Sequence, residues 1–286
     1  ARGTGRLSML RILVILAAIS IALPSLGQEA KWKKWEVEAD TMMNRQDFEA
    51  AIKLFGKVIK SSKLEDKAAY PSVYKRAVCY YSIGRLEESL DDLELFIPEY
   101  PGVLQGYILK AFVYRDLGDL EALQATIDQA LVIQPGDPSL IKWRAGIYLD
   151  MGEYEKVMED MLYVRAIQND PEVESYLGFA FYNLDQPDSA IQAMNRAIEL
   201  DATYLPAYLY GGSFSLQEGN NELALKYLNV ALRLDPSNTT AQFYKGVALV
   251  ELEREDEACS ILSKAFYAGE DDAGDYLKEY CYKLQN

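Results

Sequence analysis

The sequence predicts an all-α protein, a solenoid of stacked helix-turn-helix repeats, and three observations support this fold class. First, small residues recur every 34 residues along two series, Ala190, Ala224 and Ala258 and Gly178, Gly212 and Gly246. Second, Ala224, Leu228 and Ala231 have the i, i+4, i+7 spacing of one helix face. Third, turn-forming residues at 219–220 and 235–236 break the chain on either side of that segment. Repetition at this period is typical of stacked repeat proteins.

The amino-terminal segment predicts a secretory signal peptide over residues 9–28. Arg11 precedes an apolar run from Ile12 to Leu23, and small residues follow up to Gln28. A basic start, a short apolar stretch and small residues before a polar boundary are typical of such leaders. We expect cleavage on either side of Gln28, and we interpret residues 1–8 as upstream read-through or cloning-derived sequence.

An uncleaved membrane anchor is the alternative interpretation of the same segment. The apolar stretch from Leu10 to Leu26 is 17 residues long. That length lies at the lower limit for a helix that crosses a bilayer. The chain would then be a membrane-tethered envelope assembly factor, and it would contact a membrane only in that case.

The repeats are expected to occupy most of residues 29–286. Seven helix-turn-helix units are expected, beginning near Trp32, Tyr70, Leu104, Pro138, Pro171, Leu205 and Thr239. The first interval is longer than the others because a polar insertion follows residue 60. After the seventh unit, a helix over about 273–284 is expected to cap the final apolar face, since terminal repeats of solenoids need a covering element.

These residues resemble the tetratricopeptide repeat (TPR) family, whose pattern combines small residues, an aromatic residue and a turn glycine in each unit. The first-helix small position is occupied by Ala39, Ala77, Ala111, Ala145, Gly178, Gly212 and Gly246. The aromatic position is occupied by Tyr80, Tyr114, Tyr148 and Phe181, and the turn glycine by Gly84, Gly118, Gly152 and Gly219. Asp185 replaces this glycine in the fifth unit. The resemblance implies a right-handed superhelical solenoid of about seven TPR repeats with a C-terminal capping helix.

The composition argues against several classes of function. The net charge is −15, and because the first 28 residues carry three arginines and no acid, the remainder carries −18. An acidic surface repels phosphates, so we expect no nucleic-acid partner. The chain has no histidine, which rules out histidine-based catalytic triads and histidine-ligated metals. We therefore expect no enzyme activity, catalytic residue, cofactor, metal or small-molecule substrate.

The three cysteines, Cys79, Cys259 and Cys281, match neither a zinc site nor a redox pair in their spacing. We interpret them as small buried residues with free thiols. A disulfide between Cys259 and Cys281 is the alternative, because both lie in the last two expected helices and export would permit oxidation.

The resemblance implies that the first helix of each unit lines a concave groove. The residues expected to face it share aromatic, aliphatic or basic side chains: Tyr74, Val78, Tyr81, Ile108, Phe112, Arg115, Lys142, Phe179, Tyr182, Leu209 and Phe243. Aromatic and arginine side chains are frequent anchors of protein interfaces. Packing between neighbouring first helices is the alternative role for each of them.

The favoured function is therefore an exported interaction scaffold, secreted or periplasmic in a bacterial envelope. It would bind a segment of another protein or a peptide in the groove. The competing hypothesis of an enzyme is disfavoured, because no nucleotide-binding, hydrolase or metalloprotease motif occurs in the sequence.

Overall fold

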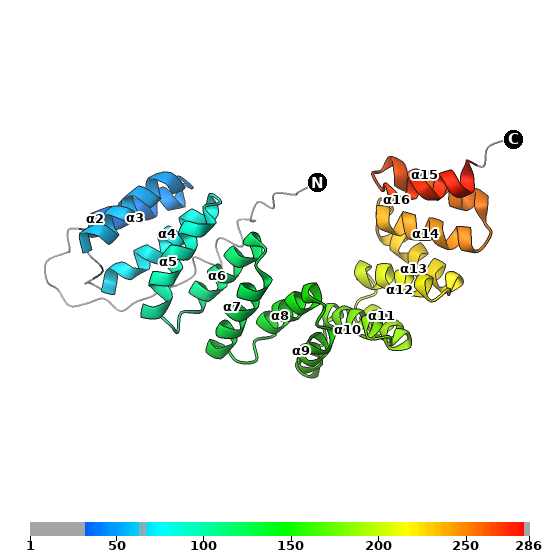
Figure 1. The fold of residues 1–286 in the computed structure, drawn as a ribbon, viewed down its shortest axis with the longest axis horizontal. Coiled ribbons are helices and arrows are strands. Elements are labelled where there is room, and N and C mark those ends of the chain that lie inside the picture. Colours follow the sequence, from blue (N-terminus) through cyan, green and yellow to red (C-terminus); the bar gives the residue numbers. More distant parts are fainter. Residues whose placement is uncertain (1–31, 63, 65–66, 283–286) are drawn as a thin grey trace. The chain divides into compact units, whose positions relative to one another are not determined.

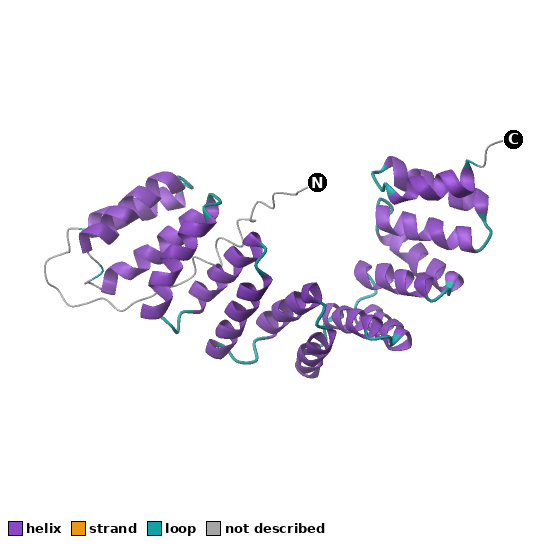
Figure 2. Ribbon diagram, viewed as in Figure 1, coloured by secondary structure: helices purple, strands orange, loops and turns teal. Residues whose placement is uncertain are grey.

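The computed structural model describes residues 32–62, 64 and 67–282, and every regular element within these ranges is helical (Figures 1 and 2). The expected leader at 9–28 and residues 1–8 lie outside the described part. The chain divides into two compact units, unit 1 over residues 1–140 and unit 2 over residues 141–286. The all-α fold class is confirmed.

Unit 1 contains three consecutive helix pairs and a short 3-10 turn over Lys67–Ala69. The helices are α2 (Lys33–Asn44), α3 (Phe48–Ser62), α4 (Tyr70–Ser82), α5 (Leu86–Glu99), α6 (Leu104–Leu117) and α7 (Leu120–Ile133). Buried faces of α2 to α6 meet in one core, in which Phe55, Leu93 and Phe96 are enclosed.

The fourth pair begins with α8 (Pro138–Met151), most of which belongs to unit 2. The helices that follow are α9 (Tyr154–Ile167), α10 (Pro171–Asn183), α11 (Pro187–Leu200), α12 (Leu205–Gln217), α13 (Asn221–Leu234), α14 (Thr239–Glu251) and α15 (Glu255–Tyr267). Leu228, Leu249 and Leu262 are buried in the core that α12 to α15 share.

Each helix pair turns at one residue with left-handed backbone geometry. In four pairs this residue is a glycine, with φ between 70° and 78° at Gly84, Gly118, Gly152 and Gly219. In the other three it is Gln46, Asp185 or Glu253, with φ between 57° and 63°. Glycine adopts this geometry without steric cost, whereas other residues do so with strain. The left-handed turn is therefore present in every described repeat, whether or not the residue at that position is glycine.

Close contact between the two helices of a pair explains the small residues of the repeat. A Cβ built on Gly246 would lie 2.5 Å from Leu262 Cδ2, and one on Gly212 would lie 2.7 Å from Leu228 Cγ. In unit 1 the same position is the fully buried Ala77, whose carbonyl accepts a hydrogen bond of 2.9 Å from the Ser89 hydroxyl. Small side chains at this position let the second helix pack directly on the first.

The C-terminal cap expected over about 273–284 is helical over residues 272–281, and residues 283–284 lie outside the described part. It consists of α16 (Asp272–Tyr276) and a π-helical turn over Leu277–Cys281. Leu277 is buried against the core of unit 2. The Tyr282 amide donates to the Leu277 carbonyl over 2.9 Å, which is the i to i+5 bond of a π turn.

The interpretation of all three cysteines as free thiols was wrong for two of them. Cys259 of α15 and Cys281 of the cap form a disulfide, with Cα atoms 5.6 Å apart. The helices of the seventh pair and the cap place the two residues side by side although they are 22 positions apart in sequence. Cys79 is a buried free thiol as expected, and burial raises its pKa to about 12.

Candidate functional site

Four aromatic side chains gather on the first helices α10 and α12 of unit 2, and we call them the aromatic cluster: Phe179, Tyr182, Tyr210 and Phe214. The Phe179 ring packs edge-on against Tyr210, with 4.3 Å between centroids. The Tyr182 and Phe214 rings stack at 4.4 Å. Phe214 is buried, whereas the other three rings are half-buried and keep part of their surface open to a partner.

A pocket of about 280 Å³ lies beside this cluster, and we call it the terminal pocket. It is formed by α12, the following turn, the start of α13, α14 and α16. The lining residues are Ser213, Leu216, Gln217, Gly219, Asn221, Phe243, Tyr244, Val247, Glu251 and Tyr276. Gln217 joins the pocket to the aromatic cluster, because its Oε1 accepts a hydrogen bond of 2.8 Å from the Tyr182 hydroxyl. Cluster and pocket therefore form one continuous candidate site.

Polar contacts position the Tyr182 ring in this site. Its hydroxyl also lies 3.3 Å from Glu218 Oε1. Burial and the charge of Glu218 raise the pKa of Tyr182 above its ordinary value. The tyrosine thus links α10 to the end of α12 across one repeat.

The predicted groove residues of α4 are placed in the core of unit 1. Tyr74, Val78 and Tyr81 are all buried, and Tyr74 packs against Phe96 with 5.2 Å between ring centroids. The Tyr81 hydroxyl donates to Asp116 Oδ2 over 2.7 Å and so ties α4 to α6. The expectation that these three side chains offer a surface was wrong, because neighbouring helices cover them.

The predicted groove residues of α6 are more accessible. Ile108 and Phe112 are half-buried and Arg115 is exposed. The Arg115 guanidinium lies 4.9 Å from the Phe112 ring centroid and pairs with Asp116 at 2.8 Å. Arg115 is therefore already engaged in contacts within unit 1.

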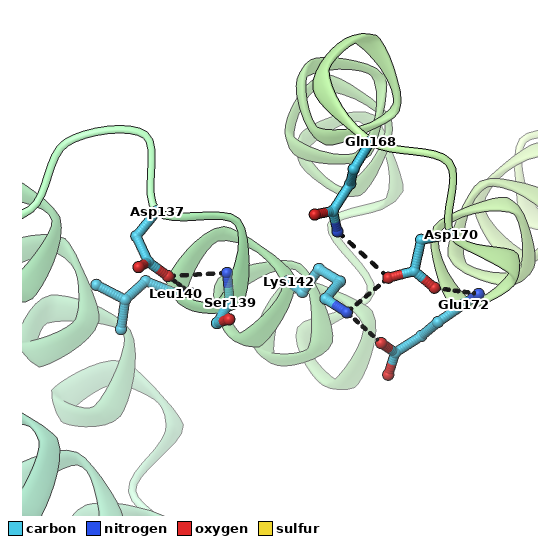
Figure 3. A network of polar contacts seen from close by, with 7 residues as sticks. All are labelled: Asp137, Ser139, Leu140, Lys142, Gln168, Asp170 and Glu172. Carbon is cyan, nitrogen blue, oxygen red and sulfur yellow. Dashed lines mark hydrogen bonds and ion pairs between the residues drawn. The ribbon is translucent and has the colours of Figure 1, made fainter.

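Lys142 is held in a polar network and does not act as an open anchor (Figure 3). Its Nζ atom donates to Asp170 over 2.8 Å and to Glu172 over 2.6 Å. Burial alone would lower the pKa of Lys142, but these two carboxylates raise it. Asp170 also accepts from the Glu172 amide over 2.9 Å and thereby caps α10. The network fixes α8 to the start of α10.

The remaining predicted residues lie in unit 2, at or near the candidate site. Phe179 and Tyr182 belong to the aromatic cluster, and Phe243 lines the terminal pocket. Leu209 is half-buried and packs against the core of α12 to α15. Three of the eleven predicted residues therefore lie at the candidate site, two in the cluster and one in the pocket.

Several residues of the site were not predicted from the sequence. Three of them had a detectable signal, because Ser213, Leu216 and Val247 lie 34 residues after Phe179, Tyr182 and Ser213. Tyr276 lacked such a signal, because it reaches the pocket from the cap, which has no counterpart in the repeats.

A second, larger recess of about 430 Å³ lies among α9, α10 and α11 and has a polar lining. Its floor holds Glu174, which is buried between Arg196 at 3.0 Å and Arg165 at 3.6 Å. Burial raises the pKa of Glu174 despite both guanidinium groups. Because these charges pair with one another, we assign the recess a structural role.

The described part of the chain contains no cluster of three or more metal-ligating carboxylates or cysteines. Among the described helices, none combines the length and the apolar composition needed to cross a bilayer.

Comparison with known protein families supports the repeat assignment. A tetratricopeptide repeat model matches residues 37–103 and 215–273, and a second model of that description matches residues 177–204. Together these segments cover more than half of the chain. The TPR repeat-containing protein YpiA of Bacillus subtilis is 27% identical over 177 residues, which are 59% of this chain and 41% of that protein.

A tetratricopeptide repeat and J domain-containing co-chaperone of Cryptococcus neoformans is 30% identical over 86 residues, which are 30% of this chain and 16% of that protein. The chain thus spans less than half the length of these curated relatives.

Solved structures share the fold at low sequence identity. A tetratricopeptide repeat protein from Parabacteroides merdae has a TM-score of 0.63 at 13% identity, covering 86% of this chain and 97% of that chain. The C-terminal part of a TPR repeat-containing protein from Cytophaga hutchinsonii has a TM-score of 0.65 at 17% identity, covering 84% of this chain and 98% of that chain. From the family models, the seven helix pairs and these neighbours, we conclude that the chain belongs to the tetratricopeptide repeat family of protein-interaction scaffolds.

Proposed function

We propose that this protein is an exported scaffold that binds a peptide or a segment of another protein on the aromatic cluster and terminal pocket of unit 2. The observation that carries the proposal is the continuity of the site. Half-buried rings on α10 and α12 adjoin a pocket that contains three further aromatic side chains. Aromatic side chains that combine apolar area with few rotatable bonds are favoured anchors for protein partners.

Two observations support export. Residues 9–28 have the composition of a secretory leader. In addition, Cys259 and Cys281 form a disulfide, and such bonds persist mainly in oxidising compartments. We place the mature protein outside the cytoplasm, in a bacterial periplasm or secreted.

The charge of the chain supports a protein partner over nucleic acid. A net charge of −15 repels a phosphate backbone and attracts basic proteins. The lack of histidine favours a binding role over a catalytic one, since no histidine is present to act as a general base. We propose neither a substrate nor a cofactor.

The mass of the mature protein distinguishes a cleaved signal peptide from an uncleaved membrane anchor. The apolar stretch from Leu10 to Leu26 favours the membrane-tethered assembly factor as a second candidate function. Intact-mass measurement of the protein from its host should give an amino terminus at Gln28 or Glu29. A mass that retains Met9 through Leu23 would replace the exported scaffold with the tethered factor.

Site-specific photocrosslinking in host cells tests the binding surface. A photoreactive benzoylphenylalanine would replace Tyr182 or Tyr210 in the aromatic cluster. Matched controls replace Tyr163 of α9 and Tyr267 of α15, which are 51% and 83% exposed on second helices. We expect crosslinks to a partner protein from the first two positions and none from the controls. Crosslinks from the control positions alone would contradict the proposed surface.

A further inference from the structure

Three aromatic side chains, Phe243, Tyr244 and Tyr276, form part of the wall of the terminal pocket. The Phe243 ring lies 5.7 Å from the Tyr244 ring and packs edge-on against Tyr276 at 5.6 Å, measured between centroids. The Tyr276 ring in turn stacks with Tyr280 at 5.8 Å. The face of an aromatic ring carries negative partial charge and attracts a cation placed over it.

The polar groups of the pocket are hydrogen-bond acceptors or neutral amides and hydroxyls. Asn221 Oδ1 is buried and has no hydrogen-bond partner in the described structure. Glu251 adds an exposed carboxylate, and no lysine or arginine is among the lining residues. A buried acceptor without a donor is unfavourable, and a ligand that carries N–H groups would satisfy it.

Two helix ends strengthen the negative potential. Leu216 and Gln217 belong to the last turn of α12, and Glu251 is the last residue of α14. The C-terminal end of a helix carries partial negative charge, which basic residues in the last turn often offset. Neither α12 nor α14 has a basic residue there. The positive end of α13 near the pocket is offset by Glu222 in its first turn.

The phenol of Tyr280, beside the pocket, is close to two carboxylates. The carboxylate of Glu279, together with burial and the carboxylate of Glu251, raises the pKa of Tyr280 above its ordinary value. Two acidic side chains thus lie near the aromatic wall that Tyr276 and Tyr280 form.

From this juxtaposition we propose that the terminal pocket binds a lysine or arginine side chain of the partner protein, with the cation over the aromatic walls and its N–H groups directed to Asn221 and Glu251. The inference rests on the proposed function and specifies the chemistry of the partner. A volume of about 280 Å³ suits one long side chain, since pockets for small-molecule ligands are roughly 300–1,000 Å³. The net charge of −15 would also steer a basic partner toward the protein.

Side-chain probes test the proposal without the partner. The full chain, labelled at its leucine and valine methyl groups, would be titrated with Nα-acetyl-lysine N-methylamide and Nα-acetyl-arginine N-methylamide. The matched uncharged probes are the norleucine and citrulline analogues. Leu216 and Val247 line the pocket, so their methyl resonances report on it. We expect saturable shifts with the lysine or the arginine probe, and binding of each uncharged analogue that is at least about fivefold weaker.

Two variants connect binding to the pocket. Glu251→Gln removes the carboxylate and Phe243→Leu removes an aromatic face while keeping apolar volume, and each should weaken binding of the charged probe about fivefold. Glu159→Gln is the matched control, because it removes the same charge from an exposed position on α9. It should bind as the parent does, and circular dichroism should show that all three variants fold.

The outcomes separate this inference from the proposed function. Equal binding of norleucine and lysine probes, or shifts that Glu251→Gln and Phe243→Leu leave unchanged, would overturn the basic side chain as the ligand. The absence of any shift at Leu216 and Val247 would also overturn it. Crosslinks from Tyr182 and Tyr210 would still support partner binding in each of these cases. Crosslinks from the second helices alone would contradict the proposed surface, whatever the probes show.

Discussion

Buried ion pairs recur at one position of the repeat, two repeat lengths apart. Arg76 binds Asp92 through two hydrogen bonds of 2.6 and 2.8 Å, and Arg144 binds Asp160 in the same way at 2.6 and 2.9 Å. In the repeat between them, the buried Thr126 replaces the aspartate and donates to a backbone carbonyl. These charges therefore enter the interior as pairs, as their desolvation requires.

Removal of the arginine from one of these pairs should lower the free energy of unfolding, because the buried aspartate loses its counter-charge. Arg76→Met would leave Asp92, which is 2% exposed, without its guanidinium. Loss of a partner from a buried pair costs about 3–5 kcal/mol. We expect a decrease of that order in the free energy of unfolding at pH 7, measured by urea denaturation.

The loss of stability in Arg76→Met should be smaller at acidic pH. Burial raises the pKa of Asp92 even with Arg76 present, and without Arg76 this pKa should rise further. A carboxyl group whose pKa is higher in the folded state than in the unfolded state destabilises the fold fully when the pH is above the folded-state pKa. This destabilisation decreases as the pH falls and disappears once the pH is below the unfolded-state pKa of about 3.9. The double variant Arg76→Met, Asp92→Asn should recover stability at pH 7. A loss in Arg76→Met that is equal at pH 7 and pH 4 would contradict this account.

At the residue scale, the sequence predicted which helices could form a site better than which side chains do. Phe179, Tyr182 and Phe243 were predicted to face the groove and lie at the candidate site, and their role in binding stays a prediction. Tyr74 and Tyr81 have the same helical spacing and the same chemistry, yet both are buried. Whether an aromatic residue of a first helix packs or is accessible depends on the neighbouring repeat, which the spacing within one helix does not describe.

The turn within each repeat offers a test at the scale of the element. Glu253 has φ = 57° at the position where four other repeats have glycine. Left-handed geometry costs a non-glycine residue about 1–2 kcal/mol, and part of this is offset by the greater freedom of glycine when unfolded. We expect Glu253→Gly to raise the free energy of unfolding by about 0.5–1 kcal/mol.

The reverse substitution provides the control. Gly118 has φ = 76°, and a Cβ there would have no atom within 4 Å. Gly118→Ala therefore introduces backbone strain without a clash, and it should lower stability by about 1 kcal/mol. Thermal or urea unfolding that changes in the opposite direction for either variant would contradict the assignment of these turns.

The disulfide attaches the C-terminal cap to the last helix pair. Closure of a loop of about this length stabilises a fold by about 3 kcal/mol in the chain-entropy description. We expect Cys281→Ser to lower the free energy of unfolding by roughly that amount and to speed amide exchange in α16. Alkylation of the denatured, unreduced parent should modify one cysteine, Cys79. Modification of all three cysteines would show that the bond is absent.

The elements themselves were largely predictable, because each repeat carries the same local signals. Small residues at the contact of the two helices and a turn residue at constant spacing define each pair. The cap was the least predictable element. Its π-helical turn and its disulfide with α15 have no counterpart in the repeats.

At the scale of the whole molecule, the protein combines an acidic surface with one continuous aromatic site in unit 2. A net charge of −15 would speed encounter with a basic partner, but net charge by itself does not select a binding position. We propose that the aromatic cluster and the terminal pocket supply this position. The central claim is that these first-helix side chains, rather than the second helices, provide the binding energy.

The most direct test is the affinity of Tyr210→Ala for the partner that crosslinking identifies, measured by calorimetry on folded protein. Truncation of a central aromatic anchor costs about 2 kcal/mol or more, which is about thirtyfold in affinity. We expect a loss of that order for Tyr210→Ala and an unchanged affinity for Tyr163→Ala, whose side chain is exposed on α9. Full affinity in Tyr210→Ala together with a loss in Tyr163→Ala would contradict the claim.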